Sequence, residues 1–210
     1  MRKQTGNSRL QKDRVRKMFT VKINGEERQY PQGATYEDAA NDYQKKYDDL
    51  IALAARDGKI RELFKKLTRD CEITFFTLKD DVGHKTYVRS ATMLFLKAVF
   101  DVFGRDAVQS CRVEFAIGNG SYISPKGQFA ATKENAEKIR NRMQELVKSK
   151  TPFLKRSYSL DNAMELFHAE GMKDKEKLFR YRRGSFVNIY EMDGYYDYYY
   201  GYMLPNAGYV

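Results

Sequence analysis

The sequence predicts an α+β protein built from two successive modules. Three observations support this fold class: an alternating apolar run that ends at Asn24-Gly25, a nearly continuous apolar segment from Arg89 to Gly104, and an amphipathic segment over 132–150. With 42% hydrophobic and 14% aromatic residues, a chain of 210 residues can bury one or two cores. No apolar run reaches the roughly 18–20 residues that cross a bilayer, and the first residues lack the apolar segment of a secretory signal. We therefore expect a cytoplasmic protein without a membrane partner.

The formal charge of +10 is concentrated at the N-terminus. Residues 1–17 carry a net charge of +6, residues 18–80 carry −1 and residues 81–210 carry +5. A short basic tail is usually solvated, so we expect residues 1–17 to be disordered. RNA binding by this tail is the alternative interpretation, because clustered Lys and Arg side chains attract phosphate groups.

The pattern of residues 18–80 predicts a hairpin, a helix and further strands. The run "MFTVKING" alternates apolar and polar residues up to Asn24-Gly25, a strong hairpin-turn signal, and "ERQYP" supplies the returning strand. Thr35 is placed to cap the helix "TYEDAANDYQKKY", with Asp38 as its capping-box partner three residues later. Two apolar segments around Asp57-Gly58 and the segment "CEITFFTL" follow. This is the element order of a small β-grasp module.

A second module is predicted over 81–210, after an exposed boundary segment, "DDVGHK". The segment "RSATMLFLKAVFDVFG" is apolar on nearly all sides, so we expect a helix in the middle of a domain, capped by Ser90 and stopped by Gly104. A hairpin around Gly118-Asn119-Gly120 should follow. The helix predicted over 132–150 carries one apolar stripe, formed by Ala136, Ile139, Met143, Leu146 and Val147. A shorter helix, "LDNAMELFHAEG", and Tyr-rich strands complete an α+β module.

The C-terminus is rich in tyrosine: seven of the 16 tyrosines lie in the last 16 residues. Because alternate residues of a strand share a face, we expect one row of tyrosines, Tyr196, Tyr198, Tyr200 and Tyr202, to pack in the core. The opposite row contains Asp197, whose carboxylate is costly to bury unpaired, so Tyr195 and Tyr199 should form an exposed or half-exposed patch. That exposed row would dock a downstream domain or a second copy of the chain. Base stacking is disfavoured, since acidic residues and no Lys or Arg accompany these tyrosines.

Several phrases carry a family resemblance. Residues 18–80 resemble a TGS domain, the β-grasp module of threonyl-tRNA synthetases. Residues 81–210, through "RSATMLFLKAV", "AIGNGSYIS", "TKENAEKIRNRMQELV" and "RYRRGSFVN", resemble the editing domain that threonyl- and alanyl-tRNA synthetases share. The phrases "INGEERQYPQGATYED", "KTYVRSATM", "KLFRYRRGSFVN" and "DYYYGYMLPNAGY" are similar to the N-terminal half of uridine kinase-like nucleoside kinases. This last resemblance implies a downstream kinase domain, with ATP and Mg²⁺ as the cofactors of that domain.

The resemblance also assigns the editing positions. Editing domains place HxxxH on the buried helix and CxxxH on a later segment, where they hold a metal or a water near the ester to be hydrolysed. Those positions are occupied here by Arg89, Met93, Arg182 and Phe186. None of these side chains ligates zinc or accepts a proton near neutral pH. We therefore expect no hydrolysis at this site and no metal.

No other catalytic motif replaces the editing site. We expect His84 in the boundary turn and His168 at a helix rim, without further ligands near either. The segment "GNGSYISPKG" lacks the order of a phosphate-binding loop, and Ser121 and Ser124 lack a base at motif spacing. The chain itself is thus expected to contain no active site.

The arginines Arg89, Arg182 and Arg183 suggest two alternatives. They could line an anion-binding cleft for a nucleotide or an RNA phosphate, because guanidinium groups bind phosphate in a bidentate manner. Alternatively, they pair with Asp193 or Glu191 and fill an obsolete cavity. The sequence favours an accessory and regulatory region of a nucleoside kinase, and the second hypothesis is a stand-alone tRNA- or RNA-binding module. An active editing hydrolase is disfavoured by the four substituted positions.

Overall fold

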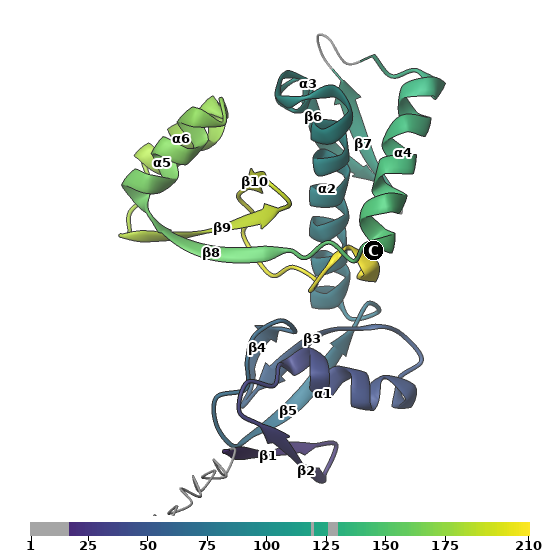
Figure 1. Ribbon diagram of the computed structural model, residues 1–210, viewed down its shortest axis with the longest axis vertical. Helices are drawn as coiled ribbons and strands as arrows, with labels where there is room; N and C mark the ends of the chain where they lie inside the picture. The colour runs from purple at the N-terminus through teal and green to yellow at the C-terminus, as the bar shows by residue number, and fades with distance from the viewer. Residues whose placement is uncertain (1–16, 119, 126–129) are drawn as a thin grey trace, which may run out of the picture.

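The computed structural model describes residues 17–118, 120–125 and 130–210, and the chain is α+β (Figure 1). Its strands form three sheets: five strands in the order β2-β1-β5-β3-β4, three in the order β10-β9-β8, and the pair β6-β7. The basic tail, apart from Lys17, and Asn119 of the predicted hairpin turn lie outside the described residues. Within the described part, no helix is both long and apolar enough to cross a membrane.

The five-stranded sheet and one helix form the N-terminal part of the molecule. Its elements are β1 (Met18–Ile23), β2 (Glu26–Pro31), α1 (Tyr36–Tyr43), a short 3₁₀ turn η1 (Gln44–Lys46), β3 (Ile51–Arg56), β4 (Lys59–Glu62) and β5 (Cys71–Thr77). The hairpin predicted at Asn24-Gly25 joins β1 to β2, and both residues have a positive φ, as a two-residue turn requires. The predicted capping box is confirmed: Asp38 N donates to Thr35 Oγ1 over 3.2 Å, and Thr35 N donates to Asp38 Oδ2 over 2.7 Å.

The remaining elements surround a long helix, α2 (Asp81–Phe103). They are α3 (Arg105–Gln109), β6 (Cys111–Ile117), β7 (Gly120–Pro125), α4 (Lys133–Lys148), β8 (Leu154–Ser159), α5 (Leu160–Ala169), α6 (Lys173–Arg180), β9 (Phe186–Met192), β10 (Tyr195–Asp197) and a 3₁₀ turn η2 (Ala207–Tyr209). In Figure 1, α2 stands above the five-stranded sheet, with α4 along one side and the β8–β9 arm on the other. The hairpin β6-β7, the amphipathic helix α4 and the shorter helix α5 match the sequence prediction.

The start of α2 differs from the prediction. The helix begins at Asp81 with Asp80 as its N-cap, so residues 81–85 of the predicted boundary segment are helical, and His84 is exposed on a helix rather than in a turn. Gly83 is buried in the first turn and packs directly against the end of β5. Only glycine fits at this position, because a Cβ would lie 1.9 Å from the carbonyl oxygen of Thr77. Ser90 lies inside the helix, where its Oγ donates to Thr86 O over 2.9 Å. The helix ends at Gly104, as predicted.

Two hydrophobic clusters share strand β3. Ile51 and Ala54 pack in the cluster between the five-stranded sheet and α1, whereas Ala52 and Leu53 pack in the larger cluster around α2. Every residue from Ile51 to Ala55 is consequently buried. A strand covered on both faces is uniformly apolar, which is what "IALAA" shows.

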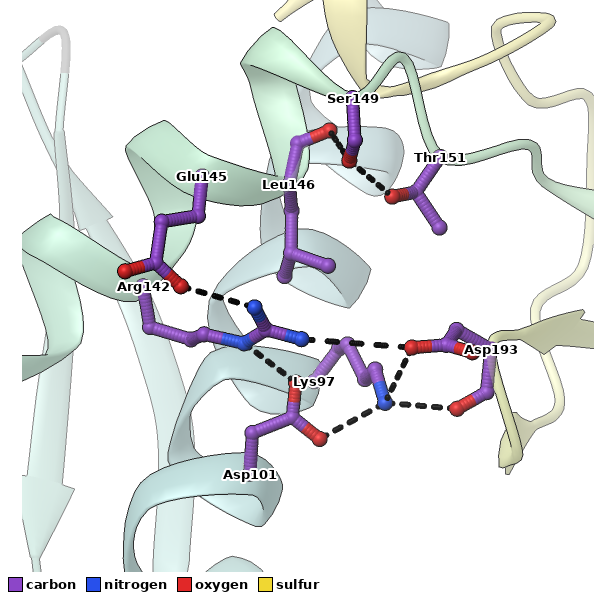
Figure 2. Close-up of polar contacts among 8 residues, drawn as sticks. All are labelled: Lys97, Asp101, Arg142, Glu145, Leu146, Ser149, Thr151 and Asp193. Carbon is purple, nitrogen blue, oxygen red and sulfur yellow. Dashed lines mark hydrogen bonds and ion pairs between the residues drawn. The ribbon is translucent and has the colours of Figure 1, made fainter.

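A buried lysine connects the elements around α2 (Figure 2). Lys97 Nζ lies 2.7 Å from Asp101 Oδ1 on the same helix and donates to Asp193 O over 2.6 Å in the β9–β10 turn. Arg142 of α4 reaches the other oxygen of Asp101 over 2.8 Å. The ammonium group is therefore compensated by two carboxylates and a carbonyl, which makes its burial tolerable.

Candidate functional site

The first pair of predicted editing positions, Arg89 and Met93, lies on α2, one helical turn apart. Met93 is fully buried in the larger cluster. Arg89 is half-buried, and its Nη1 donates to Tyr202 O over 2.9 Å. Burial lowers the pKa of Arg89, while the nearby Tyr190 and Glu62 oppose that shift. Arg89 is thus a half-buried cation whose hydrogen bond goes to the C-terminal segment.

The second pair lies between α6 and β9. Arg182 is exposed after the end of α6, donates through Nη1 to Tyr198 Oη, and lies with its guanidinium carbon 5.4 Å from the centre of that ring. Phe186 is the first residue of β9 and is 67% exposed. Arg183 is also exposed. A phenyl group open to solvent supplies no ligand or base to a pocket.

The C-terminal segment contacts both arginines. Tyr198 is the partner of Arg182 and Tyr202 is the partner of Arg89. Gly201 approaches Arg89 so closely that a Cβ there would lie 2.6 Å from the guanidinium carbon. The side chains of Arg89 and Arg182 are therefore held by the chain's own tyrosine-rich segment.

The acidic partners that the sequence suggested for these arginines are engaged elsewhere. Asp193 contacts Lys97, and Glu191 pairs with Arg156 of β8 over 3.0 Å. The prediction that Asp193 or Glu191 neutralises the arginines is wrong, because the Asp193 carboxylate is directed to Lys97 of α2 and the Glu191 carboxylate to Arg156 of β8.

The predicted burial of the tyrosine rows is wrong for Tyr195 and Tyr200, whereas Tyr196, Tyr198 and Tyr202 are half-buried and pack against the larger cluster. Tyr195 is 1% exposed and the hydroxyl of Tyr199 is buried, whereas Tyr200 is 87% exposed. Strand β10 ends at Asp197, so the two-residue alternation does not continue to Tyr202. The other reason is electrostatic and concerns Asp197 itself.

Asp197 is buried and compensated by three donors. Lys175 Nζ of α6 lies 3.1 Å from its Oδ1, Tyr198 N donates to the same oxygen over 2.7 Å, and Tyr195 Oη donates to Oδ2 over 3.3 Å. A buried carboxylate with an ion pair and hydrogen bonds avoids most of the desolvation penalty. The row that contains Asp197 can therefore enter the core.

A cavity of about 580 Å³ adjoins Asp197. Its walls come from α2, β6 and α6, together with Tyr195 and Tyr199. Tyr199 Oη has no hydrogen-bond partner among the described residues. Burial and the charge of Asp197 raise the pKa of Tyr199 well above its usual value, so this phenol stays protonated near neutral pH. A carboxylate that is ion-paired with Lys175 and phenols that stay protonated suit binding through hydrogen bonds better than acid–base chemistry.

Metal ligands do not gather in the described part of the chain. No three His, Cys, Asp or Glu side chains come together there in an arrangement that could hold an ion. His168 on α5 is exposed and lies with Nδ1 3.1 Å from Glu176 Oε2.

The sequence of the chain is similar to those of threonine–tRNA ligases from several bacteria. The chain is 31% identical over 159 residues to a threonine–tRNA ligase of Syntrophotalea carbinolica, a match that covers 75% of this chain and 25% of the ligase. The ligase of Maricaulis maris is 28% identical over 88% of this chain, and that of Thermotoga neapolitana is 27% identical over 92%. The chain has a threonyl-tRNA synthetase-like scaffold. It spans about a quarter to a third of the length of these relatives, with 28% of the Maricaulis and 30% of the Thermotoga ligase covered. No family model matches the chain.

Sequence reasoning missed three features of this threonyl-tRNA synthetase-like scaffold. Strand β8 and helix α6 were not predicted, and neither was the pairing of Lys175 with Asp197. The strong amphipathic pattern of "KDKEKLFR" could have indicated α6. The ion pair has no local signal, because its two residues are far apart in the sequence.

Proposed function

We propose that this chain is a non-catalytic accessory and regulatory region of a uridine kinase-like nucleoside kinase, built on the threonyl-tRNA synthetase-like scaffold. In this proposal residues 18–80 form a TGS-like module and residues 81–210 a degenerate editing-like module. The partner would be a downstream kinase domain, which would supply the ATP and Mg²⁺ sites.

One observation carries the non-catalytic part of the proposal: the state of the four editing positions. Hydrolysis of an ester needs a metal-bound or base-activated water beside the carbonyl. Met93 is buried in the core and Phe186 is open to solvent. The guanidinium groups of Arg89 and Arg182 carry only N–H donors, and they have no atom that could accept a proton or ligate a metal. These residues offer neither a ligand nor a base.

The kinase link rests on the phrases that resemble uridine kinase-like proteins. The exposed ring of Tyr200 and the adjoining tyrosine-rich segment are the surface that we assign to the kinase domain, or to a second copy of the chain. An RNA-binding role is the second candidate, because the relatives are named threonine–tRNA ligases and the N-terminal tail is basic.

Deacylation assays test the non-catalytic part. We expect the purified chain to leave mischarged threonyl-tRNA and alanyl-tRNA intact, with or without added zinc. Deacylation above a no-protein control that is abolished by Arg182→Ala would refute it.

The coding sequence tests the kinase link. A Walker-type motif downstream of Val210 is expected, together with a nucleoside kinase activity whose KM or stability changes when residues 1–210 are deleted. A stop codon directly after Val210, combined with salt-sensitive RNA binding that survives deletion of residues 1–17, would favour the RNA-binding candidate instead.

A further inference from the structure

A second cavity lies where the five-stranded sheet meets the β8–β9 arm. Its volume is about 580 Å³. β4 and the segment after it form one wall, and Lys155, Asn188 and Tyr202 form the other. Five basic side chains line it: Arg56, Arg61, Lys65, Lys66 and Lys155.

One of these five cations is neutralised by a buried acid. Lys155 Nζ lies 3.1 Å from both carboxylate oxygens of Glu62, which is 3% exposed. The same carboxylate accepts hydrogen bonds from Tyr190 Oη over 2.5 Å and from Met203 N over 3.3 Å. Glu62 is thereby satisfied and fixed in the wall of the cavity.

The other four cations are not neutralised in this way, although Lys65 Nζ lies 5.2 Å from the centre of the Phe64 ring. Within the part of the chain that the structure describes, none of the four forms an ion pair with a carboxylate. Arg56 Nη1 donates to Thr68 Oγ1 over 3.0 Å, a contact that orients the guanidinium group without neutralising it. Four like charges around one small cavity repel each other, and a bound anion would relieve that repulsion.

Backbone hydrogen bonds fix the segment that carries the two lysines. Tyr36 N donates to Lys65 O over 3.0 Å, Glu37 N donates to Leu63 O over 2.8 Å, and Leu67 N donates to Ala34 O over 2.7 Å. The lysine-bearing segment is thus tied to the first turn of α1. A site held by such contacts is pre-organised for a ligand.

A buried hydroxyl group points independently to a missing acceptor. Tyr36 is 1% exposed and lines the cavity, yet its Oη has no hydrogen-bond partner among the described residues. Arg56 and Arg61 are its charged neighbours, and both carry only N–H donors. The phenol proton therefore has donors around it and no oxygen to bind. An oxygen of an anionic ligand would satisfy it.

We infer that this cavity binds a small phosphate-bearing ligand with two or more negative charges, such as a nucleotide or pyrophosphate. Arginine and lysine side chains together recognise phosphate oxygens, and the cavity volume falls in the roughly 300–1,000 Å³ range of small-molecule sites. A long nucleic-acid backbone would need a basic groove that continues along the surface, whereas here the buried Glu62 and the β8–β9 arm close the cavity on one side. The inference does not depend on the proposed kinase link.

Calorimetric titration of the full chain with pyrophosphate and with ADP tests the site. We expect saturable binding and a rise in the unfolding temperature, because a ligand of the folded state stabilises it by mass action. Arg61→Gln should weaken binding about tenfold through the loss of a charge-assisted hydrogen bond. Lys59→Gln is the matched control, since Lys59 is an exposed cation on the same strand that does not line the cavity. Absence of binding, or equal losses for the two variants, would overturn the inference.

Tyr36→Phe separates a binding role from a structural one. The variant removes a hydroxyl group whose proton has no acceptor among the described residues, so its unfolding temperature without a probe should equal or exceed that of the unmodified chain. Its affinity for pyrophosphate should fall about fivefold. A lower unfolding temperature with unchanged affinity contradicts the site. Binding of an RNA oligonucleotide that neither pyrophosphate nor ADP displaces also contradicts it.

Discussion

Gly83→Ala tests the packing of α2 against β5, because two arguments predict opposite signs. Helix propensity alone predicts that alanine stabilises the helix by about 1 kcal/mol. In the structure, however, the added Cβ would lie 1.9 Å from Thr77 O and 2.8 Å from Thr77 C, where ordinary contacts begin at 3.4 Å. Thr77 cannot easily move, since its N and Oγ1 both donate to Asp80 Oδ2, over 2.6 and 3.0 Å.

The expected cost follows from the movement this clash demands. The start of α2 must shift by more than an ångström, which adds overpacking of about 1–3 kcal/mol and weakens hydrogen bonds worth about 1 kcal/mol each. After the propensity gain is subtracted, Gly83→Ala should lower the free energy of unfolding by about 3 kcal/mol, as measured by guanidinium denaturation followed by circular dichroism. Gly120→Ala is the control, because the nearest atom to its Cβ is 3.7 Å away. A Gly83→Ala variant as stable as the unmodified chain would refute the close approach.

Three further predictions concern Glu62, the Arg89–Gly201 contact and the tyrosines. Glu62→Gln should lower the free energy of unfolding by about 2 kcal/mol in chemical denaturation. This is less than the ~3–5 kcal/mol of a fully buried pair, because the Lys155 side chain retains 15% exposure. The control is Glu165→Gln at an exposed position, which should change the free energy of unfolding by no more than about 0.5 kcal/mol. Gly201→Ala should cost about 2–3 kcal/mol in the unmodified chain and only about 1 kcal/mol in an Arg89→Ala background, and equal costs would contradict the contact. Burial raises the pKa of eight tyrosines, so the stability they contribute is present below their unfolded pKa of about 10 and is lost as the pH rises above it. Absorbance at 295 nm, which reports tyrosine ionisation, should show these eight tyrosines ionising only at the pH at which the far-ultraviolet circular dichroism signal of the folded chain is lost. Complete ionisation of all tyrosines while that signal is retained would contradict the prediction. The eight are Tyr30, Tyr36, Tyr43, Tyr190, Tyr195, Tyr196, Tyr199 and Tyr209.

Features that depend on neighbouring residues could be predicted from the sequence. The Asn24-Gly25 turn requires positive φ at two adjacent positions, and the Thr35–Asp38 box joins residues three apart. Both are decided within one turn of chain. The strand β3 was also predictable from its uninterrupted apolar run, although which face meets which core was not.

Features that depend on distant residues could not be predicted. The start of α2 is set by the close approach of Gly83 to the end of β5. The prediction of Ser90 as the N-cap is therefore wrong: its hydroxyl group donates to Thr86 O within the helix and accepts from Leu204 N over 3.0 Å. The burial of Asp197 depends on Lys175, which comes from another element. Because an unpaired carboxylate is costly to bury, the sequence analysis assigned the face of the strand that carries Asp197 to solvent. That assignment is wrong because the pairing of Asp197 with Lys175 cannot be read from the sequence.

The same limit applies to the candidate site. The resemblance predicted four substituted editing positions and stays a prediction, but the hydrogen-bond partners of Arg89 and Arg182 come from the C-terminal segment and had no sequence signal. The basic cavity had no sequence signal either, since Tyr36 and Lys155 are separated by more than half of the chain.

The Glu62 carboxylate has a consequence for how the molecule unfolds. It belongs to β4, yet its partners are Lys155 of β8, Tyr190 of β9 and Met203 near the C-terminus. If the five-stranded sheet melted alone, the Lys155 ammonium group would lose its carboxylate partner, and if the β8–β9 arm melted alone, a buried carboxylate would lose its compensating donors. Either partial state carries an uncompensated polar group, which disfavours it relative to the fully folded and fully unfolded chains. The two hydrophobic clusters should therefore melt in a single calorimetric transition rather than in succession.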